Sequence, residues 1–387
     1  MPQPFRLGRG LRLTAFAAGT IGLLGPAPPA DATGFQRFSL STAGLGLANA
    51  MGADAEHPSS MAYNPSALAF QEGTHLEAGF MRRYGKLESG GGRSEPETTL
   101  YTHDLYATYR GPAASWGAGL AVNRPFRMDS DWKGDFSQQQ GAATRTELDL
   151  IDVNPTVAYK LRPDLAVSLG ADYYNALDFE YSSWGSSGNE VKRTGDGDGL
   201  GGTAGIMFWR EGWALAASYR SGTDLEVDGN GLSGNDFHLP ARARIGFKWR
   251  PNLSWSIHLD AVRTSWSDYE GLEGLDGVES GKEWSDTVGY RLGSMVRLSD
   301  KVAVRFGYSY DADPKDDTTF DPRSPSGNRH MLTLGGNWEG DLLRYNLGYG
   351  FAIRPSRDVE GAAISEYDGR NRTTAQYLMF SVGYSDW

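Results

Sequence analysis

Apolar and polar residues alternate along most of the chain after residue 75. In 302–310, "VAVRFGYSY", valine, phenylalanine and tyrosine occupy every second position, and alanine, arginine, glycine and serine lie between them. Segment 343–351, "LRYNLGYGF", has the same pattern. Because successive side chains of a β-strand point to opposite faces, each segment is predicted to be a strand with one apolar and one polar face.

About fourteen such segments follow one another, an even number as in most bacterial outer-membrane barrels. Short turn signals, such as "LRPD" at 161–164 and "LSDK" at 298–301, separate them from longer polar links. This succession of short turns and longer links predicts an up-and-down arrangement, in which each strand runs antiparallel to the next one in the sequence. The predicted strands centre near residues 79, 105, 118, 153, 169, 206, 218, 245, 258, 291, 306, 334, 347 and 380. The predicted long links are 85–99, 127–145, 178–200, 266–284, 311–328 and 352–374.

The apolar faces bear on whether the protein is a membrane barrel or a soluble β-sandwich, which would also alternate. Many of these faces end in tyrosine or tryptophan, as aromatic girdles at membrane interfaces do. The opposite faces combine arginine, aspartate, serine and glycine, which suits a narrow polar lumen. The sequence therefore predicts an all-β fold, a transmembrane antiparallel β-barrel of about 14 strands, with a soluble β-protein as the alternative.

The N-terminal residues predict export. A basic start precedes the short apolar run 13–25, and Ala30 and Ala32 are placed as a small-x-small cleavage site, so we predict a signal peptide at 1–32. The chain contains no cysteine, which excludes a disulfide framework. Its net charge of -11 argues against nucleic acid as a partner. We expect a multi-pass protein of the bacterial outer membrane.

Segment 33–74 differs from the rest because it is rich in Gly, Ala and Ser and alternates poorly. A barrel of this size has an interior that its own side chains do not close. We therefore predict that 33–74 is a hatch, or plug, inside the lumen of a barrel made by 75–387. A disordered N-terminal linker is the alternative.

Several short motifs follow one another in a recognisable order. The hatch segment contains "GFQ" at 34–36, "GLG" at 44–46 and "NPSAL" at 64–68, and "WGAGLAVNRPF" at 116–126 and "RFGYSYDADP" at 305–314 come later. In this order the chain resembles the FadL family of outer-membrane transporters for long-chain fatty acids and aromatic hydrocarbons, over nearly the whole mature chain. The resemblance implies passive transport of hydrophobic compounds, by capture in the barrel and lateral release through a kink in the third strand.

The resemblance also assigns residues to these steps. Phe35 corresponds to an aromatic residue near the ligand. The hatch motif is carried over to Gly44, Gly46, Asn64 and Pro65, and the Asn64–Pro65 pair is expected to pack beside the kink. The lateral gate is carried over to Asn123, Arg124, Pro125 and Phe126.

Backbone chemistry supports the kink independently. Proline cannot donate a hydrogen bond to a β-ladder, so Pro125 in a central strand predicts a bulge or a break. In a closed barrel such a break would open the wall within the membrane. The alternative is that Pro125 merely ends its strand at the rim.

The ligand class stays open at this point. Link 178–200 is short and polar where larger members of the family carry long loops with an apolar capture groove, and "EGLEGL" at 270–275 is acidic. The basic groups that hold a carboxylate in fatty-acid transporters cannot be placed. A long-chain fatty acid and an aromatic or aliphatic hydrocarbon are both possible. Other expected partners are outer-membrane lipid or lipopolysaccharide and, through the aromatic C-terminal signal ending near Trp387, the barrel-insertion machinery.

Other constellations predict no chemistry. The acidic residues of 311–317 are interpreted as a solvated loop rather than a metal site. Ser256, His258 and Asp260 share one strand face, where side chains point in parallel and do not form a relay by themselves. We therefore predict no catalytic residue, no metal and no cofactor. The alternative function is an outer-membrane barrel with a mainly structural, adhesive or phage-attachment role.

Overall fold

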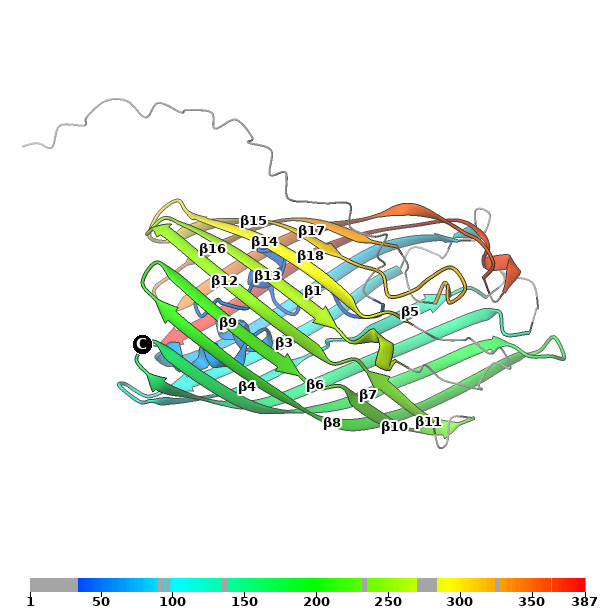
Figure 1. The fold of residues 1–387 in the computed structure, drawn as a ribbon, viewed down its shortest axis with the longest axis horizontal. Coiled ribbons are helices and arrows are strands. Elements are labelled where there is room, and N and C mark those ends of the chain that lie inside the picture. The colour runs from blue at the N-terminus through cyan, green and yellow to red at the C-terminus, as the bar shows by residue number, and fades with distance from the viewer. Residues whose placement is uncertain are drawn as a thin grey trace, which may run out of the picture.

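The computed structural model describes residues 34–89, 93–94, 98–133, 138, 140–231, 235–269, 284–323, 327–362 and 364–386. The predictions made for the signal peptide at 1–32, the acidic stretch 270–275 and Trp387 lie outside these residues. The described strands form one closed antiparallel barrel around the N-terminal segment (Figure 1).

The wall has fourteen strands, four of which are interrupted and consist of two segments. The interrupted pairs are β2 with β3, β4 with β5, β9 with β10, and β11 with β12. β1 pairs with β18, from Thr74 opposite Asp386 to Glu88 opposite Arg372, and this pairing closes the barrel. The predicted centres all lie within strands. The segments are β1 (Gly73–Ser89), β2 (Arg93–Ser94), β3 (Thr98–Arg110), β4 (Trp116–Asn123), β5 (Arg127–Asp131), β6 (Ala143–Arg162), β7 (Leu165–Trp184), β8 (Glu190–Arg210), β9 (Trp213–Arg220), β10 (Thr223–Asn230), β11 (Asn235–Leu239), β12 (Arg242–Asn252), β13 (Trp255–Thr264), β14 (Thr287–Arg297), β15 (Val302–Asp311), β16 (Arg329–Glu339), β17 (Leu343–Val359) and β18 (Gly369–Asp386).

The two faces of each strand meet different surroundings. In β16, Leu332 and Leu334 are exposed on the outside, whereas Met331 and Thr333 are buried on the lumen side. Exposed aromatic residues also gather where the short turns lie, as an interface girdle requires. These residues are Trp116, Tyr159, Trp213, Trp249, Trp255 and Trp338. The apolar faces therefore point outward, and the soluble alternative is wrong.

The predicted long links contain more strand than expected. β7 continues to Trp184 and β8 begins at Glu190, so most of the predicted link 178–200 is a hairpin that extends the wall. A crossing needs about ten residues per strand, and the outer half of such a strand needs no apolar face. Lys192 instead pairs with Glu180 across this hairpin, with Nζ and Oε2 2.7 Å apart. Alternating hydrophobicity ends at the membrane surface, but backbone pairing continues.

The N-terminal segment lies inside the barrel, where Figure 1 shows it in blue between the walls. It contains α1 (Thr42–Gly46) and the 3-10 helices η1 (Pro58–Ala62) and η2 (Pro65–Phe70). Nearly all of residues 34–71 are buried, so this segment is a hatch and not a disordered linker. No helix in the described part of the chain is long and apolar enough to span a membrane.

The hatch needs glycines because it packs directly on the wall and on itself. A Cβ on Gly44 would collide with Tyr63 Oη, and one on Gly46 would lie 3.2 Å from the Cα of Gly335 in β16. Charged side chains then tie the hatch to the wall. The Nζ of Lys248 in β12 lies 2.8 Å from Asp54 Oδ1.

Candidate functional site

The third wall strand is broken at the predicted proline. β4 ends at Asn123 and β5 begins at Arg127, and β3 pairs with β4 only from Tyr109 to Leu105. Beyond that point the pairings found for the described residues join β3 to β1 and β5 to β6. Pro125 therefore interrupts the strand in its interior and does not end it at the rim. Past the break, no pairing between β3 and β5 is found among the described residues.

Part of the hatch pairs with the wall at this break. Gln36 and Phe126 form an isolated antiparallel β-bridge. The Arg37 N–H donates to the carbonyl of Pro125 (2.9 Å), and the Arg127 N–H donates to the carbonyl of Phe35 (3.1 Å). Three hatch residues thus take the place of a missing strand partner.

Phe35 points into a set of aromatic rings, which we call the aromatic cage. Its ring is 3% exposed. The cage consists of Phe126, Phe237, Trp266, Tyr269 and Trp284, whose ring centroids lie 5.1 to 6.4 Å from that of Phe35. Leucines 148, 150, 225 and 239 extend the same buried cluster. This is an apolar site, and a side chain of the hatch fills it.

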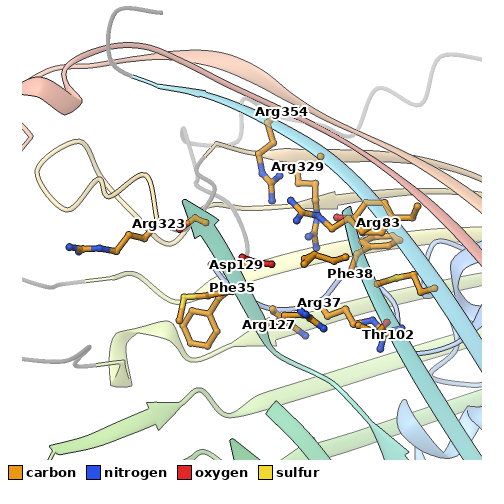
Figure 2. A pocket seen from close by; sticks show the side chains of 18 of the residues that line it. Phe35, Arg37, Phe38, Arg83, Thr102, Arg127, Asp129, Arg323, Arg329 and Arg354 are labelled. Atoms are coloured by element: carbon orange, nitrogen blue, oxygen red, sulfur yellow. The ribbon is translucent and has the colours of Figure 1, made fainter. Parts of the chain in front are cut away.

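A second cavity adjoins Phe35 and is strongly cationic. It encloses about 830 Å³ of empty space including its open side, and it lies between the hatch, β1, β3, β5, β16 and β17. Figure 2 shows Arg83, Arg329 and Arg354 grouped on one side of this cavity, with Phe35 on the other. The charged side chains of its lining are Arg37, Arg83, Lys86, Arg127, Asp129, Arg323, Arg329 and Arg354.

The charges of this cationic cavity are unequally compensated. Arg37 makes a buried bidentate pair with Asp104 (2.6 and 2.7 Å), and Arg329 pairs with Asp311 (3.0 Å). Arg354 is buried, and among the described residues no carboxylate pairs with it and its Nε has no hydrogen-bond partner. A buried guanidinium is costly unless an anion accepts its hydrogen bonds. The cavity can therefore accommodate a negatively charged group next to the aromatic cage.

The loop between β15 and β16 covers the cage. The Nζ of Lys315 lies 5.5 Å from the ring centroid of Trp284 and 5.6 Å from that of Phe320. It also donates to the carbonyl of Asp321 (3.1 Å). Burial lowers the pKa of Lys315 to about 8, although Asp313 and Asp321 act in the opposite direction.

The hatch motif lies elsewhere than expected. Asn64 caps η2 by accepting from the Ser66 N–H (3.0 Å), and its amide donates to the carbonyls of Ile206 in β8 (3.2 Å) and Ala217 in β9 (3.4 Å). Pro65 opens the same helix. The segment at the kink is thus Phe35–Arg37 and not the Asn64–Pro65 pair, because Asn64 satisfies a helix start and two wall carbonyls far along the sheet.

Two predicted gate residues remain, and only one of them, Arg124, is held by a salt bridge. The Nε of Arg124 lies 2.8 Å from Asp149 Oδ1 of β6. Asn123 is buried, and neither polar atom of its side chain has a hydrogen-bond partner within the described structure. The break therefore leaves the buried amide of Asn123 without a hydrogen-bond partner among the described residues.

The constellations set aside in the sequence form structural contacts. Ser256 Oγ and His258 Nε2 are 3.0 Å apart, closer than parallel strand neighbours were expected to come. Asp260, however, pairs with Arg244 (2.5 Å) and accepts from the Gly52 N–H (2.8 Å). Within the described residues, no group of three or more His, Asp or Glu side chains could hold a metal ion.

Sequence reasoning missed two parts of this site. The basic residues Arg83, Arg329 and Arg354 were not placed, and the cage residues Trp266 and Trp284 were treated as ends of a polar link. Large aromatic side chains flanking 266–284 were a detectable signal, since a solvated link has no need of them. The grouping of the arginines had no such signal.

Comparison with known proteins agrees with this geometry. Residues 26–384 match the family model described as outer membrane protein transport protein (OMPP1/FadL/TodX). No curated protein matches the sequence.

Solved structures share the fold at low sequence identity. A Pseudomonas aeruginosa FadL homologue superposes with a TM-score of 0.77 at 18% identity, over 91% of this chain and 100% of that one. The CymD monoaromatic hydrocarbon channel gives 0.65 at 14% identity, over 90% and 98%. The P. putida toluene transporter TodX gives 0.61 at 16% identity, over 84% and 92%. Because the family model matches nearly the whole of this chain, residues 26–384, the chain belongs to the OMPP1/FadL/TodX family of outer-membrane transport proteins.

Proposed function

We propose that this protein transports hydrophobic compounds passively, and that a ligand takes the place of Phe35 in the aromatic cage before it leaves sideways between β3 and β5. The observation that carries the proposal is the break at Pro125, where the hatch segment Phe35–Arg37 supplies the missing pairing. One three-residue segment thus fills the cage and covers the wall opening. Removing it would free both.

The energetics favour displacement by an apolar ligand. The segment is held at the wall by two backbone hydrogen bonds, each worth about 0.5–1.5 kcal/mol net. Burial of the Phe35 ring contributes about 1.5–3 kcal/mol, comparable to the two bonds together, and a ligand in the same cage buries its own apolar surface in place of the ring. Ligand entry therefore replaces one apolar contact with another, and only the weak pairing at Pro125 is lost.

The direction of release follows from solvation. Lateral release keeps the ligand's apolar surface out of water, which is worth about 25 cal/mol per Å². For a ligand of a few hundred Å² this difference reaches several kcal/mol. Release into the lipid is therefore favoured over release into an aqueous compartment.

The cationic cavity favours a ligand with a carboxylate, such as a long-chain fatty acid. Arg354 offers hydrogen bonds that no described carboxylate accepts, and it lines the same cavity as Phe35. The hydrocarbon tail would enter the cage while the head group meets Arg83, Arg329 and Arg354. A neutral aromatic compound, as carried by the toluene transporter with the same fold, would use the cage alone.

Uptake by intact cells tests the lateral route. The double variant Arg124→Thr, Pro125→Val restores an N–H and should let the strand pair continuously. We expect oleate uptake to fall at least tenfold while oleate binding to the purified protein persists. Pro155→Val is the matched control, because Pro155 lies in the neighbouring β6, where pairing with β4 is unbroken. Undiminished uptake by the double variant would refute the lateral route.

A further inference from the structure

A separate cavity lies at the short-turn end of the lumen, under the hatch. It contains about 1040 Å³ of empty space including its open side. The ends of β8, β12, β14, β15, β16 and β17 line it together with hatch residues 55–58. Short turns of such barrels face the periplasm, so this cavity is a periplasmic vestibule.

The vestibule contains a buried cation, Arg305, that forms no salt bridge with a carboxylate of the described residues, although Asp54, Glu56 and Glu77 lie near enough to act on its charge. Arg305 of β15 is 1% exposed, and its guanidinium contacts Asn346 Oδ1 (3.3 Å) and His57 Nε2 (3.1 Å). Its Nε has no partner, and among the described residues no carboxylate pairs with it. The two acids of the vestibule are already engaged. Glu56 pairs with Lys248, Arg250 and Arg297, and Glu339 pairs with Arg344 (3.1 Å).

His57 cannot satisfy its two neighbours at once. Its Nε2 faces Arg305, and its Nδ1 lies 2.9 Å from Nη1 of Arg344 in β17. A neutral imidazole has one acceptor nitrogen and one N–H, whereas guanidinium nitrogens only donate. One of the two contacts therefore opposes a donor to a donor. An acceptor group placed between these side chains would remove the conflict.

We propose that the periplasmic vestibule binds an oxyanion, a carboxylate or phosphate group, through Arg305, His57 and Arg344. Its oxygens would accept charge-assisted hydrogen bonds from both guanidiniums and from the imidazole N–H. Because His57 belongs to the hatch and the two arginines to the wall, the bound anion would also fasten the hatch to β15 and β17. This site lies at the opposite end of the lumen from the aromatic cage and does not depend on the transport proposal.

Equilibrium dialysis with radiolabelled inorganic phosphate tests the site on the full-length protein in detergent and chloride buffer. We expect saturable binding of about one phosphate per chain, weakened at least tenfold by Arg305→Gln. Arg297→Gln is the matched control, since Arg297 lines the same vestibule but is paired with Glu56. We expect this control to weaken binding less than threefold. Absence of saturable binding, or equal losses in the two variants, would overturn the proposal.

Two further arms complete the test. Octanoate that displaces phosphate would identify a carboxylate-bearing ligand as a source of the oxyanion, and phosphate bound in the presence of octanoate would identify free phosphate. If Arg305→Gln does not fold, amide hydrogen exchange of hatch residues 55–62 in the wild type decides. Phosphate should slow this exchange, and unchanged exchange at saturating phosphate contradicts the site. The binding and exchange measurements with phosphate alone contain no hydrophobic ligand, so their failure leaves the lateral route untouched.

Discussion

Gln36 of the hatch lies opposite Phe126 of the third wall strand as an antiparallel β-bridge. An unpaired strand edge inside a membrane is unfavourable because no water can satisfy its backbone groups. Here the N-terminal segment satisfies the Pro125 carbonyl and the Arg127 N–H, at the position where β3 no longer does. The same three residues hold the Phe35 ring in the aromatic cage. Wall closure and cage occupancy are therefore coupled through one short segment.

Truncating Phe35 should uncouple closure of the wall from occupancy of the aromatic cage. We expect Phe35→Ala to leave the barrel folded, to empty the cage and to speed amide exchange at residues 35–37, because the main apolar anchor of the segment is lost. Oleate binding should become tighter, since the ring no longer competes for the cage. Phe70→Ala, which alters a hatch ring stacked on Trp209 at the opposite end of the lumen, is the control. Weaker oleate binding in Phe35→Ala would mean that Phe35 is part of the binding surface and not its competitor.

Neutralising Arg354 should separate acids from hydrocarbons. A charge-assisted hydrogen bond contributes about 1.5–3 kcal/mol, so Arg354→Gln is expected to weaken oleate binding about tenfold or more. Toluene binding should change less than twofold, because toluene has no charge to place in the cavity. Calorimetric titrations of both ligands measure this, with Arg297→Gln at the far end of the lumen as control. Equal losses of affinity for the two ligands would show that Arg354 does not bind the carboxylate of oleate.

The close approach at Gly44 predicts a leaky variant. The added methyl of Gly44→Ala would collide with Tyr63 Oη, and such overpacking costs about 1–3 kcal/mol. We expect the hatch to loosen and single-channel conductance to rise towards that of a barrel lacking the hatch. Adding Tyr63→Phe, which removes the colliding oxygen, should restore part of the wild-type conductance. Wild-type conductance in Gly44→Ala would show that the hatch packs differently in this region.

Lys315 makes closure of the β15–β16 loop depend on pH. Its pKa is about 8 in the closed loop, against 10.5 for an exposed lysine. The open state therefore binds more protons between these values, and closure becomes more stable as pH rises from about 8 towards 10.5. Amide exchange of residues 315–322, corrected for its intrinsic pH dependence, should show greater protection at pH 9.5 than at pH 7. Lys315→Met should abolish this difference, and a difference that persists in the variant would assign it to another group.

Local sequence patterns were sufficient to predict many of the strands, the break in the third one and the hatch. The period-two alternation at 302–310 and 343–351 predicted β15 and β17, because a strand in lipid must present an apolar side chain at every second residue. The missing N–H of Pro125 predicted the break for an equally local reason. The Gly, Ala and Ser content of 33–74 predicted a hatch inside the lumen. Each of these features depends on residues that are close together in the sequence.

Only the tertiary structure decided which side chains lie together, because this depends on strand register and on closure of the barrel. Arg83, Arg329 and Arg354 meet because β1 pairs with β18, β18 with β17 and β17 with β16, a sheet order that no local pattern encodes. Asn64 points towards β8 and β9 rather than the kink, because its buried amide donates to the wall carbonyls of Ile206 and Ala217. His57 meets Arg305 and Arg344 because the pairing of β15 with β16 and of β16 with β17 brings these two arginines together beside the hatch. The sequence alone determined which segments form strands and where one breaks, and only the closed barrel determined which side chains share its interior, since long-range contacts arise from pairing between distant segments.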